Sequence, residues 1–341
     1  MIAWTNVSTK LNTLVSAGTP PDIANLDSYV SFAADDLLLP VEEALPKATY
    51  DDLIPVMRDN GTYKGKAYGI PFISSARALF YNEDLMTKAG VQPPKNWTEL
   101  KAAAVAIHAK TGQIGYGLPM GAPENFGEFS IWAWNNGGNW RKNDQWTINS
   151  PENVAALQAQ VDMYKAGVTQ KSPWSTHRDD LFKMFGEGKV GILQGAVFLP
   201  AVMKGQKSTV KYGIIQSPPN DGKQPATLAV EDYLMAFKAT KNKDAVGKFL
   251  AYFYKAENYQ KFLTTEGMLP VTKSAAAAMK SDPVAGPFVG MLDNAKFYPT
   301  TVPAWPAVQA EAVAKMGLAI SGQQTPQAVL DGLQKFATSQ P

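Results

Sequence analysis

Glu231 and Asp232 are adjacent carboxylates inside Leu228–Phe237, an apolar stretch that is typical of a β-strand. Two carboxyl groups that flank one bond form the catalytic set of a glycoside hydrolase, so this pair supports an enzyme hypothesis. Neighbouring side chains of a strand point to opposite faces, which argues against a shared site for these two. The hypothesis therefore needs a partner carboxylate from elsewhere in the chain.

A second strand candidate, Tyr68–Asn82, also has polar residues in its middle. Its end, Ala78–Tyr81, is apolar, whereas Ser74, Ser75 and Arg77 precede that end. Such a strand either lies at a sheet edge with a solvated centre or leaves one core, crosses a gap and enters another. Because two strand candidates share this character, we expect two α/β lobes that are joined by more than one segment, with a cleft between them.

The composition offers few residues for other kinds of catalytic or binding site. The sequence has no cysteine and only two histidines, His108 and His177, so thiolate chemistry, a His-based metal site and a Ser-His-Asp triad are not expected. The 30 acidic and 32 basic residues nearly balance, and no Lys/Arg run of the kind that binds nucleic acid is present. No apolar stretch reaches the roughly 18 residues of a membrane span.

Apolar periodicity and helix-capping residues predict the helices and strands that position these side chains. A chain of 341 residues favours two domains. Apolar residues at helical spacing predict a helix over 1–17, and Asn96–Glu99 resembles a capping box. Ser150-Pro151-Glu152 is typical of a helix start. Strand and helix candidates alternate until a mostly helical final third, so the predicted class is α/β.

Several short motifs occur in the same order as in a known family. The chain resembles the extracellular solute-binding proteins of bacterial ABC transporters, in particular the sugar-binding group that includes maltodextrin-binding protein. The motifs that carry this resemblance are Ser16–Ile23, Gly69–Pro71 with Leu79–Asn82, Lys88–Gly90 with Pro93–Leu100, Gly188–Ile192, Gly267–Val271 and Ser321–Thr325.

The resemblance implies a two-lobed periplasmic-binding-protein fold of type II with three inter-lobe crossings. The crossings are expected near Ser74–Ala76, Ala229–Tyr233 and Lys296–Thr300. Lobe 1 would comprise residues 1–74 and 234–296, and lobe 2 would comprise residues 75–233 and 297–341.

Ligand contacts can be carried over position by position. Asp27 lies in a loop where the family places a polar contact, and Trp305 matches an aromatic residue that stacks on sugar. Ser75 replaces a frequent carboxylate, with Arg77 nearby, and Tyr298 stands where the family often has Arg. Gly195-Ala196-Val197 replaces the usual Gly-Pro-Trp, so one stacking ring is missing.

Further candidates rest on their placement in the chain. At least one of Glu231, Asp232 and Tyr233 should face the cleft. Trp174 could reach it from lobe 2, and either Trp132 or Trp134 could do so from one helix. Weaker candidates are Asn125 and Glu128.

The resemblance implies that the chain binds a mono- or oligosaccharide, closes by hinge bending and docks on the permease subunits of an ABC importer. It implies a monomer without catalysis, cofactor, metal or nucleic-acid partner, located in the periplasm or outside the cell, lipid-anchored or soluble. The alternative ligand is glycerol phosphate or another polar non-sugar solute. A phosphate would require clustered Arg or Lys residues or a helix N-terminus, for which Arg77 alone is weak support.

The start of the chain departs from the family. The family opens with a strand, a helix and a second strand, whereas this sequence begins at about the end of that second strand. Roughly 40 residues, about one βαβ unit, have no counterpart. The expectation is a destabilised first lobe with an exposed sheet edge, and an export signal outside the given sequence.

Overall fold

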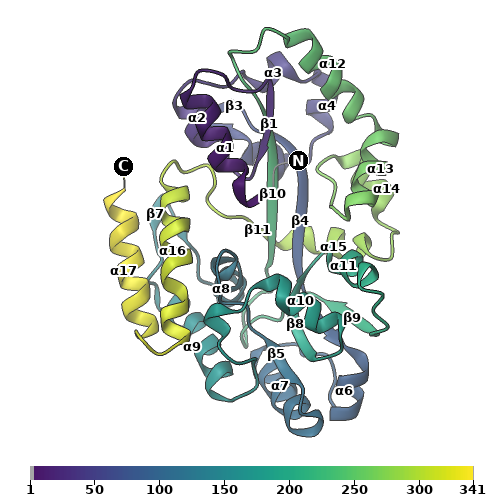
Figure 1. Ribbon diagram of the computed structural model, residues 1–341, viewed down its shortest axis with the longest axis vertical. Coiled ribbons are helices and arrows are strands. Elements are labelled where there is room, and N and C mark those ends of the chain that lie inside the picture. The colour runs from purple at the N-terminus through teal and green to yellow at the C-terminus, as the bar shows by residue number, and fades with distance from the viewer. Residues whose placement is uncertain (1–3, 341) are drawn as a thin grey trace. The chain divides into compact units, whose positions relative to one another are not determined.

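The computed structural model describes residues 4–340, and among these all side chains except those of residues 4–6 and 293. The chain divides into two compact units (Figure 1). Unit 1 comprises the residues up to Ser75, Val230–Val289 and Pro299–Trp305. Unit 2 comprises Ala76–Ala229, Gly290–Tyr298 and the residues from Pro306 onward.

This division differs in detail from the lobe boundaries expected from the sequence. Val230–Tyr233 and Trp305, which we expected in lobe 2, belong to unit 1. The physical reason at the first position is that the Tyr233 ring lies 5.0 Å from that of Tyr29 in the unit 1 core. Along the described residues the chain changes unit five times, after residues 75, 229, 289, 298 and 305, so three crossings are not confirmed.

Unit 1 combines short helices with a small number of strands. Its helices are α1 (Trp4–Ser16), α2 (Val30–Ala34), α3 (Val41–Ala44), α4 (Lys47–Asp52), α5 (Pro55–Asn60), α12 (Lys243–Phe253), α13 (Ala256–Glu266), α14 (Lys273–Met279) and most of α15 (Ala285–Met291). Its strands are β1 (Ile23–Leu26), β2 (Thr62–Tyr63), β3 (Lys66–Ala67) and parts of β4 (Ile70–Asn82) and β10 (Thr227–Ala236).

The core of unit 1 forms where α1 and α2 pack on the β1–β10 pair. β1 runs antiparallel to Tyr233–Ala236 of β10. Leu11 of α1 is buried, and Val7 and Val15 lie against the same cluster, as the periodicity of residues 1–17 predicts. Gly69 lies against two rings of this core, because a Cβ there would stand 2.6 Å from Tyr29 and 2.8 Å from Tyr233. A side chain at this position would displace both tyrosines.

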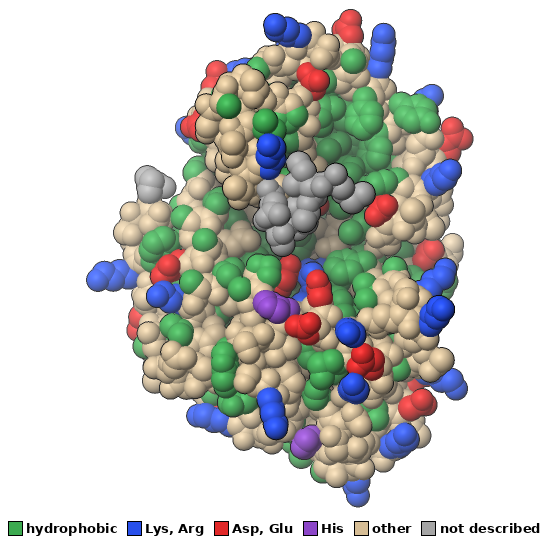
Figure 2. All heavy atoms as spheres, viewed as in Figure 1, with side chains coloured by type: hydrophobic (Ala, Val, Ile, Leu, Met, Phe, Trp, Pro, Cys, Tyr) green, Lys and Arg blue, Asp and Glu red, His purple; other side chains and the backbone are tan. Residues whose placement is uncertain are grey.

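Helix α12 carries an aromatic surface. The rings of Phe249 and Phe253 are stacked with centroids 6.2 Å apart, and Phe253 also contacts Phe72 and Phe262. Phe249 is 51% exposed and Tyr252 is 61% exposed. Hydrophobic side chains gather at the upper right of Figure 2, over the part of the chain in which Figure 1 shows α12. Neighbouring exposed rings on one helix form a contiguous apolar patch, which is more informative than a single exposed apolar residue.

Unit 2 holds the larger sheet. Its strands are the remaining parts of β4 and β10, β5 (Ile114–Gly117), β6 (Arg141–Lys142), β7 (Gln145–Trp146), β8 (Val190–Ala196), β9 (Tyr212–Ile215) and β11 (Ala295–Lys296). Its α-helices are α6 (Glu83–Ala89), α7 (Trp97–Thr111), α8 (Asn125–Asn135), α9 (Pro151–Lys165), α10 (Arg178–Gly186), α11 (Leu199–Gly205), nearly all of α16 (Trp305–Ile320) and α17 (Pro326–Ser339). Short 3₁₀ turns are η1 (Pro173–Ser175) and η2 (Leu292–Asn294).

The pairing of strands in unit 2 mixes both directions. β4 is antiparallel to β8, with Arg77 opposite Ala196, and antiparallel to β9. β5 is parallel to β8, and all seven residues of β8 are buried. Helix α7 packs closely on this sheet, since a Cβ at Gly115 would stand 2.1 Å from the carbonyl oxygen of Ala104. The alternation of strands and helices confirms the predicted α/β class.

Capping residues place the helix starts where the sequence predicts them. The side chains of Asn96, Ser150 and Thr325 accept hydrogen bonds from backbone N–H groups in the first turns of α7, α9 and α17. The Glu99 carboxylate accepts the N–H of Lys95 at 2.8 Å, one residue earlier than in a regular capping box. Each side-chain cap stabilises its helix by about 1 kcal/mol.

Candidate functional site

A pocket in unit 2 collects buried charged side chains around Arg77, and we call it the guanidinium pocket. Arg77 comes from the middle of β4 and Arg178 is the first residue of α10. The complete lining is Arg77, Pro119, Glu124, Gly127, Glu128, Ile131, Arg178 and Gln194. The predicted polar residue of β4 therefore lies in a built pocket rather than on a solvated strand edge.

Two guanidinium groups share one carboxylate in this pocket. Nη1 of Arg178 lies 3.0 Å from Oε2 of Glu124, whereas Nη2 of Arg77 lies 3.9 Å from the same oxygen. Both guanidinium carbons stand over the ring of Phe198, at 5.9 Å for Arg77 and 5.4 Å for Arg178. A ring face attracts cations, so Phe198 helps to hold the two like charges side by side.

Burial and repulsion both act on Arg77. Only 7% of the residue is exposed. Burial first, and then the neighbouring Arg178, lower the pKa of Arg77. A guanidinium group keeps its charge in proteins, so the pocket retains two positive charges at neutral pH.

Glu128 is a buried carboxyl at the inner end of the pocket. Tyr116 donates a hydrogen bond of 2.6 Å to its Oε1, and Nε1 of Trp132 donates another of 3.0 Å. Burial raises the pKa of Glu128 to about 7, against the lowering effect of these hydrogen bonds and of Arg77. Near neutral pH this carboxyl is consequently divided between its charged and neutral forms. Trp132, a predicted ligand contact, is buried and holds Glu128 in place.

Aromatic rings stand over the start of α8 beside this pocket. Tyr298 contacts Phe126 with centroids 4.9 Å apart and Trp134 at 6.0 Å. A Cβ at Gly127 would lie 2.9 Å from the Tyr298 hydroxyl, so the glycine leaves room for it. Tyr298 also acts electrostatically on Arg77. The structure thus brings together three predicted residues, Arg77, Tyr298 and, through Glu128, Trp132.

A second group of polar side chains lies in unit 1, and we call Asn25, Asp27, Asn60, Glu231, Asp232 and Tyr233 the carboxyl cluster. Oε2 of Glu231 accepts hydrogen bonds from Asn60 at 3.0 Å and from the Tyr233 hydroxyl at 3.1 Å. Its Oε1 is buried without a hydrogen-bond partner among the described residues. An unmatched buried polar atom costs about 1–3 kcal/mol.

Both carboxyls of β10 are shifted in the same direction. Burial raises the pKa of Glu231 to about 8, and neighbouring Asp232 adds to this rise. Burial raises the pKa of Asp232 to about 7, with a further contribution from Asp27, although a hydrogen bond from Asn25 opposes it. The two side chains have separate partners, as the alternation of a strand predicts.

Three predicted residues of unit 1 are Tyr233, Trp305 and Ser75. Tyr233 packs on Tyr29, whose hydroxyl donates a 2.8 Å hydrogen bond to the carbonyl oxygen of Asn60. Trp305 is 1% exposed, and its backbone N–H donates to Val302. Ser75 is the last residue of unit 1 on β4 and is half-buried.

Trp174 does not line either group. Its ring contacts Tyr164 with centroids 5.5 Å apart, and its Cβ stands 3.1 Å from where a Cβ of Gly317 would lie. Asn125 donates a 2.8 Å hydrogen bond to the carbonyl oxygen of Val313. These contacts give both residues a packing role in unit 2.

Sequence reasoning missed Arg178, Glu124, Phe198, Gln194 and Asn60. Arg178 and Glu124 are separated by 54 positions, so neither one signals the other in the sequence. Phe198 directly follows Gly195-Ala196-Val197, where a familiar aromatic is absent. The Phe198 ring, one position after this stretch, was the sequence signal that could have predicted an aromatic surface here.

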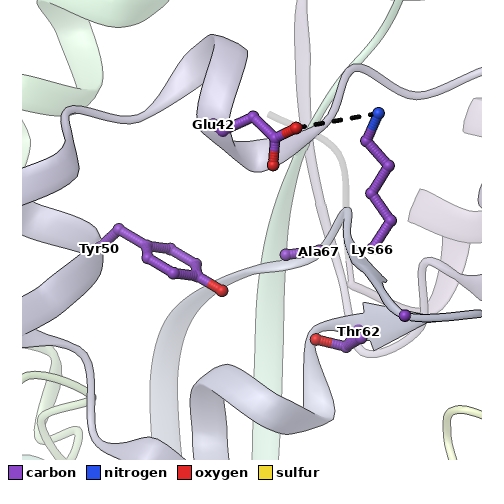
Figure 3. A pocket seen from close by; sticks show the side chains of 6 residues that line it. Glu42, Tyr50, Thr62, Lys66 and Ala67 are labelled. Carbon is purple, nitrogen blue, oxygen red and sulfur yellow. Dashed lines mark ion pairs between the residues drawn. The ribbon is translucent and has the colours of Figure 1, made fainter.

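Another hollow lies on unit 1 among Glu42, Tyr50, Thr62, Gly65, Lys66 and Ala67. In Figure 3, Lys66 extends toward Glu42, and their charged atoms are 3.8 Å apart. Both side chains of this ion pair are about half exposed or more, and exposed pairs contribute little energy. None of the sequence-predicted residues lies there, so the guanidinium pocket remains the stronger candidate.

Among the side chains that the structure describes, no group of three or more His, Asp or Glu residues could hold a metal ion. Within the same residues, no helix is long and apolar enough to cross a membrane.

The sequence profile of the bacterial extracellular solute-binding proteins matches residues 2–260. The chain belongs to this family. A binding protein of Brucella abortus is 30% identical over 339 residues, which is 97% of this chain and 82% of that protein. The sn-glycerol-3-phosphate-binding periplasmic protein of Rhizobium meliloti is 28% identical over 282 residues, or 75% of this chain and 63% of that protein.

Solved structures of the family agree with the fold. The cyclic α-maltosyl-1,6-maltose binding protein of Arthrobacter globiformis is 26% identical, with a TM-score of 0.84 over 99% of this chain and 89% of that chain. The two-lobed α/β fold and the sugar-binding relatives expected from the sequence are thereby confirmed. Family members are solute-binding proteins rather than enzymes.

Proposed function

We propose that this protein binds a sugar, as a mono- or oligosaccharide, and delivers it to the permease subunits of an ABC importer by hinge closure. The observation that carries the sugar assignment is that each unit places aromatic rings beside polar groups. In unit 2 Tyr298, whose ring contacts Trp134, acts electrostatically on Arg77, and in unit 1 Tyr29 and Tyr233 stand near Glu231. Rings cover the C–H faces of sugars, and polar groups pair with their hydroxyls.

The residues at the division between the units are the proposed hinge. Ser74–Ala76 of β4 and Ala229–Tyr233 of β10 lie where the chain passes from one unit to the other. Small backbone rotations at such positions close two-lobed proteins around a ligand. The expected ligand contacts Asp27, Ser75, Asp232 and Trp305 would then act together with Arg77 and Tyr298. The protein would work as a monomer in the periplasm or at the outer cell surface.

Catalysis is not part of the proposal. Glu231 is held by Asn60 and Tyr233, whereas Asp232 is held by Asn25, so the two carboxyls do not form one acid–base pair. A glycoside hydrolase built on Glu231 and Asp232 is the contrasting hypothesis. Glycerol phosphate is the second candidate ligand, and the juxtaposition of Arg77 with Arg178 favours it over other non-sugar solutes.

The proposal is tested by titrating the protein with mono- and oligosaccharides, followed by calorimetry and Trp fluorescence. At least one sugar should give a saturable signal, and chromatography of the mixture should show no shortened product. Tyr298→Ala should weaken that binding at least tenfold, whereas Tyr252→Ala on exposed α12 should leave it unchanged. No signal with any sugar would reject the sugar assignment, and turnover would support the hydrolase.

A further inference from the structure

The aromatic surface of α12 is a patch of rings on one face of the helix. Phe249, Tyr252 and Phe253 stand three and four positions apart, a spacing that places side chains next to one another on a helix. Phe249 and Tyr252 are each more than half exposed. Phe253 contacts the rings of Phe72 and Phe262, with centroids 5.4 Å and 5.2 Å away. The patch is therefore held in place by neighbouring rings while its outer part faces solvent.

Packing of α12 on unit 1 does not explain the exposed rings. The residues that pack inward are Val246 and Leu250, which are both buried. The opposite face of such a helix ordinarily carries polar residues. Phe249 and Tyr252 are instead apolar side chains outside the packed face, so a contact beyond the folded unit is the simplest reason for them.

Lysines adjoin this patch in the sequence. Residues 241–262 contain five lysines and only two acidic residues, Asp244 and Glu257. Lys243 forms an ion pair with Glu43. Among the side chains that the structure describes, the other four lysines are exposed and enter no ion pair, namely Lys241, Lys248, Lys255 and Lys261. The segment therefore keeps a net positive charge at the surface.

One of these lysines lies directly at the rings. Nζ of Lys255 stands 5.8 Å from the centroid of the Tyr252 ring, and Lys248 immediately precedes Phe249. Figure 2 shows Lys or Arg side chains beside the hydrophobic ones over the part of the chain in which Figure 1 shows α12. Apolar rings and cations thus share one surface.

We propose that the face of unit 1 formed by α12 and the start of α13 binds the surface of a membrane that contains anionic lipids. Helices that lie on a bilayer place aromatic rings among the headgroups and extend lysine ammonium groups to the lipid phosphates. Phe249 and Tyr252 supply the rings, and Lys248 and Lys255 supply the cations. The inference goes beyond the proposed solute binding, because no candidate ligand contact lies on α12 or α13.

A second copy of the chain fits this surface less well. Pairing through the same patch on both copies would bring the lysines of the two copies together. Like charges at short range oppose such a contact, whereas anionic headgroups attract the same lysines. Charge complementarity therefore favours the lipid surface.

The test measures how the protein partitions onto lipid vesicles that contain no other protein. Flotation with vesicles of phosphatidylcholine alone is compared with flotation on vesicles of phosphatidylcholine and phosphatidylglycerol in equal amounts. We expect the partition coefficient to be at least about fivefold larger on the anionic vesicles. Added salt should lower it, because salt screens the lysine charges.

A pair of ring substitutions tests the apolar part of the contact. Phe249→Ser combined with Tyr252→Ser should lower the partition onto anionic vesicles about tenfold, because less apolar area enters the headgroup region. Val105→Ser is the matched control, since Val105 of α7 is 43% exposed in unit 2. Circular dichroism melts confirm that each variant is folded.

A pair of lysine substitutions tests the electrostatic part. Lys248→Gln combined with Lys255→Gln should lower the partition about tenfold. Lys101→Gln combined with Lys110→Gln removes the same net charge from exposed positions of α7 and should change the partition little. This comparison separates the surface of α12 from the charge of the whole protein.

Several outcomes would overturn the inference. Absence of binding to anionic vesicles at low salt is one, and normal binding by the folded ring variant is another. Equal losses in the α7 control variants would place the contact elsewhere. A dimer detected by light scattering that disappears in the ring variant would assign the patch to a second copy. Sugar titrations of the ring and lysine variants should match the parent, so failure of this inference leaves the proposed solute binding standing.

Discussion

The carboxyl cluster of unit 1 and the guanidinium pocket of unit 2 each contain a buried ionisable side chain, Glu231 and Arg77, and burial affects the charge of the two side chains differently. In unit 1, burial raises the pKa of Glu231 to about 8, so this group is mostly neutral at pH 7. In unit 2, burial lowers the pKa of Arg77, but a guanidinium group starts so high that it stays charged. Burial therefore leaves the Glu231 carboxyl mostly neutral and the Arg77 guanidinium charged.

This difference indicates different tasks for the two groups. A protonated carboxyl both donates and accepts hydrogen bonds, which suits the hydroxyl groups of a polyol. A pair of guanidinium groups only donates, and it binds anions more strongly than hydroxyls. Substitutions in the two groups test this contrast.

Removing the more deeply buried guanidinium should have the largest effect. Arg77→Met replaces the charge with an apolar chain of similar length and leaves Arg178 to balance Glu124. We expect the affinity for the sugar that binds most tightly to fall about 100-fold, on the order of 3 kcal/mol, because a charge-assisted hydrogen bond from the guanidinium is lost. Calorimetry measures this affinity, with Arg141→Met as the control. A sugar that binds this folded variant normally would refute the contrast.

Glu231→Gln should change how stability depends on pH. The folded-state pKa of Glu231, about 8, lies above its ordinary value near 4.5, so its contribution is fully present below pH 4.5 and is lost as the pH rises through 8. Glutamine resembles the protonated form of Glu231, so the variant does not lose this stability as the pH rises. Relative to the parent, the variant should gain roughly 2–4 kcal/mol between pH 5 and pH 9 in thermal melts.

Glu187→Gln provides the control of opposite sign. A hydrogen bond from Lys189 lowers the pKa of Glu187, so its contribution is present at neutral pH and is lost on acidification. This variant should show no relative gain between pH 5 and pH 9. If Glu231→Gln also shows no gain in stability between pH 5 and pH 9, Glu231 is ionised in the folded protein and burial does not keep its carboxyl neutral.

Ligand binding should depend on pH through Glu128. Ionised Glu128 repels an anionic ligand near Arg77, so affinity for glucuronate should fall several-fold as the pH rises from 6 to 8, through the Glu128 pKa of about 7. A carboxylate ligand keeps its own charge constant over this range. Other ionisable groups also face Glu128 or its neighbours, and the parent and its Glu128→Gln variant both contain them. These groups are Arg77, Arg178, Glu124, Tyr116 and Tyr298.

Glu128→Gln should remove this pH dependence and retain binding. The comparison is made in a His177→Gln background, so that the histidine before α10 does not contribute. A slope that persists without the Glu128 carboxyl would assign the effect to another group. Calorimetry in two buffers of different ionisation enthalpy would in addition show proton uptake on binding only when Glu128 is present.

The smallest effect is expected at Phe198. Phe198→Leu removes the ring under both guanidinium groups but keeps an apolar surface, so charged-ligand affinity should fall about two- to fivefold. Phe182→Leu is a matched control, because the Phe182 ring lies under Arg178, 5.6 Å from its guanidinium carbon. Equal losses in the two variants would mean that the shared ring has no special part in pairing the charges.

Local patterns predicted much of the fold. Asn96 and Ser150 cap the expected helices, and Leu11 of α1 is buried as the apolar face of residues 1–17 predicts. Such features depend on neighbours within a few residues, which the sequence displays directly. The polar middle of Tyr68–Asn82 likewise pointed to Arg77, because a charged residue inside a buried strand needs a partner.

The partners themselves could not be predicted. Glu124 and Arg178 approach Arg77 from two other elements, and only the folded unit 2 brings the three charges together. Trp132 and Trp134, expected to face opposite sides of their helix, are both buried, because α8 is enclosed on every face. The individual ligand contacts remain predictions until binding is measured.

The aromatic surface of α12 has a practical consequence at the bench. Environment-sensitive dyes that brighten on apolar surfaces should bind around Phe249 and Tyr252 while the protein is still native. A dye-based thermal shift assay would then begin from a high background and could report dye displacement rather than melting. Label-free detection is the better choice for ranking ligands of this protein, and the same surface offers an extrinsic optical probe that is remote in sequence from Arg77 and Arg178.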